Sequence, residues 1–270
     1  MNNFTDFLAV KEYYLAIIED YFTKQFEDIS DVRLKEAMQY CFFNGGKRLR
    51  PLLTCACSQA IGVDVDKALP FAFAIECLHA QSLVHDDMPA LDNDAERRGK
   101  PSCHVAYGQG IALLTGDALL NLAYQTALSA CNDAQSIKAL KYISDAMGVD
   151  GLLGGQALEL ETDKPCEHTL RKIYSMKTSA LFRASLVVPL ILNNCDNFKI
   201  RDFESFADEF GILFQLTDDY LDALLGDEQE APAKKCEIGI QKQKCLSISS
   251  NMCDLKFANS FIEYVTERSN

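Results

Sequence analysis

The chain has 270 residues, 48% of them hydrophobic, and a formal net charge of -13. This hydrophobic content excludes an intrinsically disordered chain, and the acidic balance argues against a nucleic-acid partner, because nucleic acids are bound mainly through clustered Lys and Arg. The length suffices for one large domain or two ordinary ones, with a substantial core in either case.

The eleven cysteines show no regular spacing, and the chain starts without a basic segment followed by an apolar one. We therefore interpret them as small core residues of a protein in a reducing compartment, and we expect a cytoplasmic location. They lack the paired spacing that is typical of zinc sites. No uninterrupted apolar run reaches the length of a bilayer span, so we expect no stable membrane insertion.

Apolar residues recur at helical intervals from Phe4 to Ile18 and again from Leu69 to Leu83, and strand-like alternation is nearly absent. Turn residues predict breaks between helices at 44–46, 62–66, 88–102, 131–134, 163–165, 193–197 and 226–240. Most of these breaks are short enough to join antiparallel neighbours, and no linker divides the chain. The sequence therefore predicts an all-α protein with a single domain over residues 1–270, built as one helical bundle.

The end of the chain is harder to interpret. Residues 227–245 are polar and contain several lysines, and only Leu255 to Val265 regains a helical pattern. We expect an atypical and mobile stretch after about residue 227.

An acidic cluster ends the apolar segment before residue 88. Asp86 and Asp87 precede Pro89, which cannot continue a helix, and Asp92 follows on the loop. The C-terminus of a helix carries a partial negative charge, so adjacent aspartates there need a compensating cation. This cluster indicates a site for Mg²⁺.

A second acidic cluster lies in the other half of the chain. Asp218, Asp219 and Asp222 are three and four residues apart, so on a helix they share one stripe and repel one another. A solvated acidic face is the alternative interpretation. The flanking residues, Phe210 to Leu216 and Leu221 to Leu225, are mostly apolar and favour an internal cavity.

Basic residues form a third group. Lys47, Arg48 and Arg50 follow Gly45-Gly46, and Arg97-Arg98 follows the first acidic cluster. Glycines let a backbone approach a ligand closely, and guanidinium groups bind phosphate oxygens in pairs. Each group alone fits an ordinary surface loop, but together with two acidic clusters they indicate a diphosphate site.

A series of motifs in this order resembles the short-chain trans-polyprenyl diphosphate synthases, and among them the bacterial farnesyl diphosphate synthases. The resemblance covers about Met38 to Asp227. The motifs are Gly45-Gly46-Lys47-Arg48-Leu49-Arg50-Pro51, Glu76-Cys77-Leu78-His79, His85-Asp86-Asp87 through Asp92, Arg97-Arg98-Gly99, Gly116-Asp117-Ala118-Leu119, Gly154-Gly155-Gln156-Ala157, Lys177-Thr178 and Phe214-Gln215 through Asp222.

The resemblance implies an isoprenoid synthase fold, with helices around a central apolar cavity, and a homodimer. It implies that an allylic diphosphate condenses with isopentenyl diphosphate to give farnesyl diphosphate. Magnesium would be held by Asp86, Asp92 and Asp218, with Asp87, Asp219 and Asp222 in support. Arg97, Lys177, Thr178 and Gln215 would bind the allylic diphosphate, and the last three would also face the carbocation. Gly46, Lys47, Arg50, His79 and Arg98 would bind isopentenyl diphosphate.

His79 has two further interpretations, as a general base or as a buried structural residue. Glu159 stands where the family often has aspartate, and we expect it to have a supporting or core role.

The sequence departs from the family in two places. Gln81 and Ser82 occupy the chain-length pocket, where bacterial C15 enzymes commonly have an aromatic residue five positions before the first aspartate. Because a smaller side chain blocks the pocket less, the product is left open between C15 and C20. The C20 product would make the protein a geranylgeranyl diphosphate synthase. The late lysine motif also has no clear equivalent, although Lys234, Lys235, Lys242 and Lys244 are candidates.

The altered C-terminal region makes a non-catalytic or regulatory subunit the main alternative to an active enzyme. A metal phosphohydrolase would use the pair His85-Asp86, but it needs additional histidine ligands and leaves the second cluster unexplained. A terpene cyclase would share the metal clusters without needing the basic group.

Overall fold

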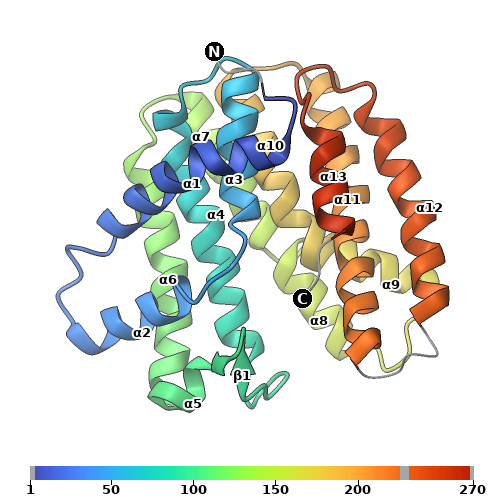
Figure 1. Ribbon diagram of the computed structural model, residues 1–270. Helices are drawn as coiled ribbons and strands as arrows, with labels where there is room; N and C mark the ends of the chain where they lie inside the picture. The colour runs from blue at the N-terminus through green and yellow to red at the C-terminus, as the bar shows by residue number, and fades with distance from the viewer. Residues whose placement is uncertain (1–3, 226–230, 268–270) are drawn as a thin grey trace.

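The computed structural model describes residues 4–225 and 231–267, almost all of them helical or in short turns (Figure 1). The predicted all-α class is confirmed, whereas the single domain over 1–270 stays a prediction. The helices are α1 (Phe7–Lys24), α2 (Val32–Phe42), α3 (Leu49–Ala60), α4 (Val65–Asp86), α5 (Cys103–Tyr107), α6 (Gln109–Ser129), α7 (Ala134–Met147), α8 (Leu152–Leu160), α9 (Glu167–Tyr174), the π-helix η1 (Ser175–Ser179), α10 (Ala180–Leu192), α11 (Asn197–Leu225), α12 (Ala231–Ser249) and α13 (Ala258–Thr266).

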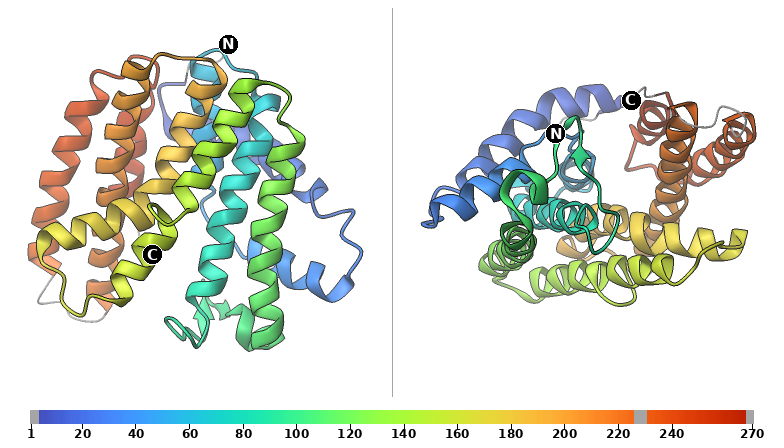
Figure 2. Two further views of the ribbon diagram at one scale, coloured as in Figure 1. Left: turned by 180° about the vertical axis from the view of Figure 1, so that it is seen from behind. Right: turned by 90° about the horizontal axis from the view of Figure 1, so that it is seen from below.

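The helices surround the middle of the molecule. Viewed from below, α4 lies on one side and α11 on the other, with α1 and the α7–α8 segment closing the remaining two sides (Figure 2). Helices α3, α4 and α10 pack on one another and are buried along most of their length. The ends of the two acidic segments, on α4 and α11, therefore face one another across this arrangement.

Aromatic side chains hold the two ends of the chain together. The ring of Phe7 in α1 lies 4.6 Å from that of Phe261 in α13, and Phe261 stacks on Phe210 of α11 at 4.4 Å. Because aromatic pairs at these centroid distances are favourable and these three rings are fully buried, the contacts fix α11 relative to α1.

The predicted break at 88–102 contains a small hairpin. Strands β1 (Glu96–Arg97) and β2 (Lys100–Pro101) pair antiparallel, and the turn between them has positive φ at Arg98 and Gly99. Two residues with positive φ are typical of the tight turns that suit a twisted hairpin. The hairpin returns the chain so that Arg97 lies beside the end of α4 (Figure 1).

One expectation for the chain's organisation was wrong. Residues 231–240, expected to be an irregular break, begin α12, while residues 226–230 of the same predicted break lie outside the described residues. The buried stripe of α12 includes Ala231, Gln241 and Ser249, which are small or polar, so no hydrophobic period showed in the sequence.

The continuous helix Glu167–Leu192 is long and apolar enough to cross a membrane by length and composition alone. Its apolar window is 67% buried inside the protein, as expected of a core helix. The expectation of no stable membrane insertion stays a prediction.

Candidate functional site

A cleft of about 1000 Å³ lies between the two halves of the molecule. Its basic wall comes from the turn before α3, from α4 and from the hairpin, and its acidic wall comes from α11. The lining residues are Asn44, Gly45, Gly46, Lys47, Arg48, Leu49, Arg50, Glu76, His79, Leu83, Arg97, Arg98, Lys100, Phe214, Asp218 and Asp222. The structure thus brings the predicted basic group and part of the second acidic cluster to one cavity.

The turn between α2 and α3 requires glycine at Gly46. Its φ is +107°, and a Cβ atom there would lie 2.8 Å from Nη1 of Arg98. The same Arg98 nitrogen donates to the carbonyl of Gly45 at 3.0 Å. A side chain at residue 46 would therefore strain the turn and displace an arginine that lines the cleft.

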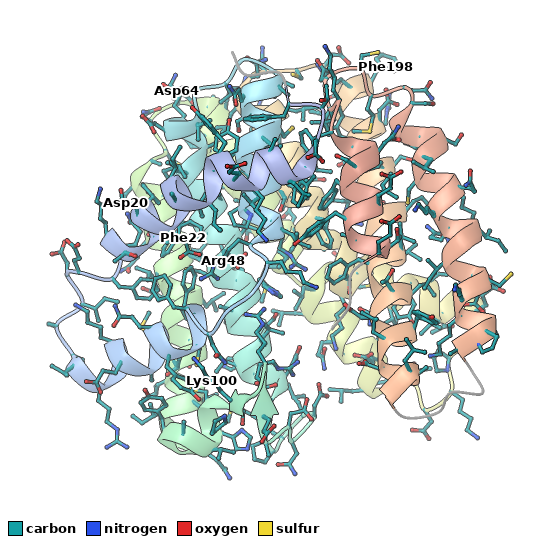
Figure 3. The ribbon with its side chains drawn as sticks, in the orientation of Figure 1. Asp20, Phe22, Arg48, Asp64, Lys100 and Phe198 are labelled. Atoms are coloured by element: carbon teal, nitrogen blue, oxygen red, sulfur yellow. The ribbon has the colours of Figure 1, made fainter. Side chains whose placement is uncertain are left out.

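Two arginines in this motif have different surroundings. Arg48 forms ion pairs with Glu19 at 2.7 Å and with Glu76 at 2.9 Å, and it lies in the interior beside α1 (Figure 3). Arg50 is 8% exposed, its guanidinium lies 4.5 Å from the centre of the Phe182 ring, and its Nε has no hydrogen-bond partner within the described part of the chain. Burial lowers the pKa of Arg50 to about 10. Arg50 is thus a buried cation that an anionic ligand would compensate.

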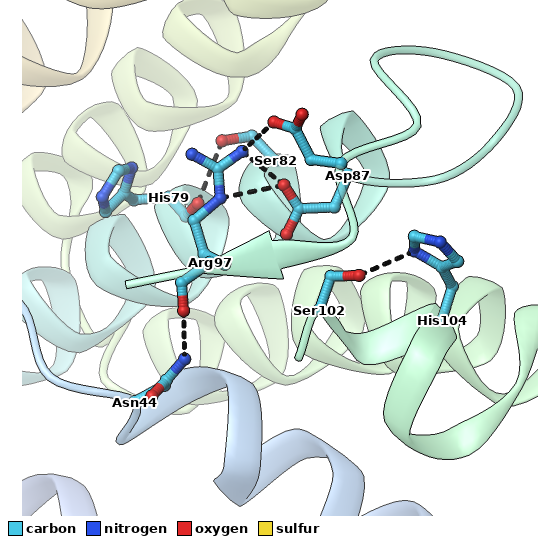
Figure 4. Close-up of polar contacts among 8 residues, drawn as sticks. Asn44, His79, Ser82, Asp87, Arg97, Ser102 and His104 are labelled. Atoms are coloured by element: carbon cyan, nitrogen blue, oxygen red, sulfur yellow. Dashed lines mark hydrogen bonds and ion pairs between the residues drawn. The ribbon is translucent and has the colours of Figure 1, made fainter. Parts of the chain in front are cut away.

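The first acidic cluster ends α4 and folds back on itself. The amide of Asp92 donates to the carbonyl of Asp86 at 2.9 Å, which brings the loop aspartate next to the helix end. Asp87 is the C-cap of α4 and accepts a hydrogen bond from Nε of Arg97 at 2.8 Å, while Arg97 also binds Asp94 at 3.2 Å (Figure 4). Arg97 is therefore held by carboxylates in the substrate-free protein.

Asp86 has no such partner in the first cluster. It is 9% exposed, and burial raises its pKa to about 6, with Asp92 and Asp87 adding to the effect and Lys177 opposing it. A buried carboxylate beside other carboxylates is the arrangement that a bound cation stabilises.

The aspartates of the second cluster point in different directions. Asp218 and Asp222, one helical turn apart, both line the cleft. Asp219 instead accepts hydrogen bonds from the hydroxyl of Tyr174 at 2.5 Å and from Nε2 of Gln215 at 3.0 Å.

Lys177 and Thr178 are carried by η1, which packs between α8 and α11. Lys177 forms an ion pair with Glu159 of α8 at 2.6 Å, and the hydroxyl of Thr178 donates to Oε1 of Gln215 at 3.0 Å. A Cβ atom on Gly155 would lie 2.7 Å from the backbone nitrogen of Lys177, so the absence of a side chain there lets α8 approach η1. Irregular π-helical turns occur frequently at functional sites.

His79 lines the cleft as an uncharged ring. Burial, with Arg50 and Arg98 nearby, holds the pKa of His79 well below its usual value. A neutral imidazole can contact a diphosphate only as an N–H donor, and the binding role of His79 stays a prediction.

Gln81 and Ser82 are both buried in α4. The amide nitrogen of Gln81 lies 2.9 Å from Nδ1 of His85, and the hydroxyl of Ser82 donates to the carbonyl of His79 (Figure 4). The other ring nitrogen of His85 lies 3.3 Å from the carbonyl of Leu113 in α6, so both ring nitrogens have partners on the side away from the cleft.

Comparison with known proteins decides the family. The Polyprenyl synthetase family model matches residues 31–255, which is most of the chain. The chain belongs to this family.

Relatives in the polyprenyl synthetase family carry names for more than one product. Farnesyl diphosphate synthase of Escherichia coli is 33% identical over 265 residues, 86% of this chain and 88% of that protein. Geranylgeranyl diphosphate synthase of Cyanophora paradoxa is 31% identical over 257 residues, 93% and 86% of the two chains. The large subunit 1 of a heterodimeric geranylgeranyl pyrophosphate synthase of Arabidopsis thaliana is 38% identical over 202 residues, 71% of this chain, and that match spans about half (54%) of the plant protein.

Solved structures confirm the predicted isoprenoid synthase fold. A geranyltransferase from Legionella pneumophila aligns with a TM-score of 0.86 and 30% identity over 98% of both chains. A geranyltranstransferase from Thermotoga maritima aligns with a TM-score of 0.83 and 30% identity over 95% of this chain and 99% of that one. The farnesyl branch within the polyprenyl synthetase family is only partly supported, because relatives named for the longer product are equally similar.

The described residues contain no group of three His, Cys, Asp or Glu side chains that could enclose a metal ion by themselves. Magnesium commonly binds one or two carboxylates together with water and substrate phosphates. The uncompensated Asp86 and the cleft-lining Asp218 therefore fit magnesium sites that a diphosphate would complete.

Three residues at the site had not been singled out from the sequence. Asn44 is buried and donates to the carbonyl of Arg97 at 3.1 Å, Glu76 pairs with Arg48, and Tyr174 binds Asp219. Asn44 adjoins the glycine turn and Glu76 opens a quoted motif, so position in the chain could have indicated them. Nothing near Tyr174 in the sequence marks it.

Proposed function

We propose that the protein is a trans-prenyltransferase that condenses an allylic diphosphate with isopentenyl diphosphate. The observation that carries this proposal is a single cleft with four arginines on one wall, two of them buried, opposite Asp218 and Asp222 on the other. Two diphosphates can be treated differently in such a cleft, one bound by cations of the protein and the other through metal ions.

The basic wall suits the substrate that keeps its diphosphate. Arg50 is buried, lies against an aromatic ring and forms no ion pair with a carboxylate of the described residues, so it can bind phosphate oxygens without first breaking such a pair. Lys47, Arg98 and the neutral His79 line the same wall. We assign isopentenyl diphosphate to this half of the cleft, with the backbone of Gly46 close to it.

The acidic half suits the allylic substrate. Asp86, Asp92 and Asp218 would hold magnesium, with Asp87 and Asp222 supporting the site. Asp219, predicted from the sequence as a third supporting residue, has both carboxylate oxygens bound by Tyr174 and Gln215. When bound, magnesium neutralises the diphosphate and makes it a better leaving group. Arg97, held between Asp87 and Asp94, is placed to bind an oxygen of the same diphosphate.

The proposed reaction has three steps, and the released diphosphate takes part in the last of them. The allylic C–O bond breaks and leaves a carbocation, which Lys177, Thr178 and Gln215 face on the diphosphate side. The double bond of isopentenyl diphosphate then forms the new C–C bond, and the resulting cation loses a proton to the released diphosphate. Fixed dipoles in a site that excludes water stabilise the carbocation and keep it from hydrolysis.

We propose farnesyl diphosphate as the product. Geranylgeranyl diphosphate is the second candidate, because the side chain at the predicted chain-length position is Gln81, which is smaller than an aromatic residue and is held toward His85. Relatives bearing both names are similar to this chain.

A phosphohydrolase is disfavoured by the partners of His85. Nδ1 of His85 contacts the amide of Gln81, and Nε2 contacts the carbonyl of Leu113. The ring therefore does not turn toward Asp86 as a shared metal ligand would.

The test is incorporation of labelled isopentenyl diphosphate into a prenyl product, with geranyl diphosphate as co-substrate and with or without magnesium. We expect magnesium-dependent incorporation by the natural protein and none by Asp218→Asn. Absent incorporation by a folded natural protein would overturn the proposal and favour a non-catalytic subunit. Incorporation by Asp218→Asn at the natural rate would remove the carboxylate wall from the mechanism.

A further inference from the structure

Both carboxylate oxygens of Asp219 are bound by other side chains. Oδ2 accepts from the hydroxyl of Tyr174 at 2.5 Å, and Oδ1 accepts from Nε2 of Gln215 at 3.0 Å. Asp218 and Asp222 line the cleft, whereas Asp219, Gln215 and Thr178 lie together beside it. The contacts of Asp219 are those of a residue that orients its neighbours.

The chemistry of these groups fixes the direction of the hydrogen bonds. An ionised carboxylate only accepts hydrogen bonds, so Gln215 must turn its amide nitrogen toward Asp219. Its carbonyl oxygen then faces Thr178, whose hydroxyl donates to it at 3.0 Å. Because the hydroxyl proton of Thr178 is used in this hydrogen bond, the oxygen lone pairs of Thr178 and the carbonyl oxygen of Gln215 are the groups that can face a developing positive charge.

We propose that Tyr174 is a positioning residue that, by holding Asp219, sets the orientation of the Gln215 amide and of the Thr178 hydroxyl toward the allylic carbocation. The inference rests on the proposed function.

The position of Tyr174 supports this role. It is the last residue of α9, it is 9% exposed, and the π-helix that carries Lys177 and Thr178 follows directly. Its hydrogen bond therefore ties η1 to α11 at the point where Gln215 and Thr178 meet. Without it, Asp219 can rotate and the amide of Gln215 can invert, which would direct a partly positive NH₂ group toward the carbocation.

Loss of the hydrogen bond between Tyr174 and Asp219 would slow ionisation of the allylic substrate. It would not weaken substrate binding, because other residues hold both diphosphates. In Tyr174→Phe we expect kcat to fall about 10-fold, below the 100-fold or greater loss typical of removing a direct transition-state contact. We expect unchanged KM values for both substrates and an unchanged magnesium concentration at half-maximal rate.

Tyr142→Phe is the matched control. The hydroxyl of Tyr142 in α7 donates to Oε1 of Glu204 in α11 at 2.7 Å, so this variant also removes a tyrosine–carboxylate hydrogen bond to α11, but at a position eleven residues before Gln215. We expect its kcat to match that of the natural protein. An equal loss of kcat in both variants would indicate a general effect on packing and would overturn the inference.

Asp219→Asn provides a second, nearly isosteric test. We expect a fall in kcat at least as large as in Tyr174→Phe, again at unchanged magnesium requirement. A raised magnesium requirement would assign Asp219 to the metal and overturn the positioning role, as would a natural kcat in Tyr174→Phe. If the natural protein itself shows no condensation, the proposed function fails first, so the two failures are distinguishable.

Discussion

At the residue scale, Asp86 combines a cost in stability with a role in the proposed reaction. Its folded-state pKa of about 6 lies above the unfolded value of 3.8, so folding takes up a proton in this range. The stability that protonation supplies is fully present below pH 3.8 and is lost as the pH rises through about 6. Near neutral pH the substrate-free protein therefore carries a penalty, which binding of a cation would relieve.

Asp86→Asn should stabilise the substrate-free protein and abolish turnover. The amide removes the buried charge and its repulsion with Asp87 and Asp92, so we expect a gain of about 1–2 kcal/mol in the free energy of unfolding at pH 7.5. Urea unfolding at pH 7.5 and pH 5 measures this gain, which should shrink at the lower pH. Asp202→Asn, at an exposed position on α11, should change neither the free energy of unfolding nor the turnover. A less stable Asp86→Asn protein would contradict this account of the site.

Arg48 and Arg50 provide a second comparison at this scale. Arg50→Met should raise KM for isopentenyl diphosphate by about 10-fold or more, which corresponds to the loss of one or two charged hydrogen bonds. We expect little loss of stability, because Arg50 forms no ion pair with a carboxylate in the part of the chain that the structure describes. Steady-state kinetics and thermal unfolding measure the two effects.

Arg48→Met is the control, and it should lower the stability of the protein with little change in KM for isopentenyl diphosphate. It leaves Glu76 buried without its cation, which costs about 3–5 kcal/mol of stability. A stable Arg48→Met protein, or an Arg50→Met protein with a natural KM, would show that the two assignments are wrong.

At the scale of elements, the approach of α8 to η1 depends on Gly155. A Cβ atom there would lie 2.7 Å from the backbone nitrogen of Lys177 and 2.8 Å from Cβ of Met176. Gly155→Ala should therefore displace η1, lowering kcat and costing about 1–3 kcal/mol of stability.

Gly239→Ala is the matched substitution, since a Cβ atom at this helical position in α12 meets nothing within 4 Å. It should stabilise the protein by up to about 1 kcal/mol, because alanine is the better helix former. Thermal unfolding of both variants, with kcat for Gly155→Ala, checks the pair. Equal effects of the two would mean that the close contact with η1 has no consequence.

Helices with an apolar period and clear turn residues could be predicted from the sequence, but α12 could not. It is held partly by polar contacts: the amide of Gln241 donates to the backbone carbonyl of Glu209 at 2.8 Å, and Nη1 of Arg171 donates to Oε1 of Gln241 at 3.4 Å. Such contacts depend on the tertiary arrangement and leave no periodic signal in the chain. The break between α7 and α8 near Gly148 was missed because only a few residues separate the two helices.

At the scale of the whole molecule, the sequence predicted which residues gather at the cleft better than it predicted their contacts. Charge type and spacing identified the basic and acidic groups. They could not separate Arg48, which is paired in the core, from Arg50, or Asp219 from its neighbours on the same stripe. Those distinctions depend on partners such as Glu19 and Tyr174, which are distant in sequence.

Helix α6 packs on α4 through one side (Figure 2), and its outer face exposes apolar side chains. Leu113, Leu114 and Leu128 are 48%, 53% and 63% exposed. We propose that this face contacts a second copy, giving a homodimer with twice the chain mass of 30.1 kDa.

Leu114→Glu should shift the protein to the monomer, because a carboxylate would be buried in the contact. Light scattering after gel filtration measures the mass. Leu8→Glu, at a similarly exposed leucine on α1, should leave the dimer intact. A monomeric natural protein would contradict the proposed contact.

The central claim is that one cleft joins two prenyl diphosphates. Mass spectrometry of the products formed from geranyl diphosphate, isopentenyl diphosphate and magnesium tests it most directly. The account predicts a diphosphate longer by one isoprene unit, that is, farnesyl diphosphate, with a further unit if Gln81 leaves the pocket deep enough. Recovery of unextended geranyl diphosphate, or of geraniol and free diphosphate, from a folded protein would contradict it.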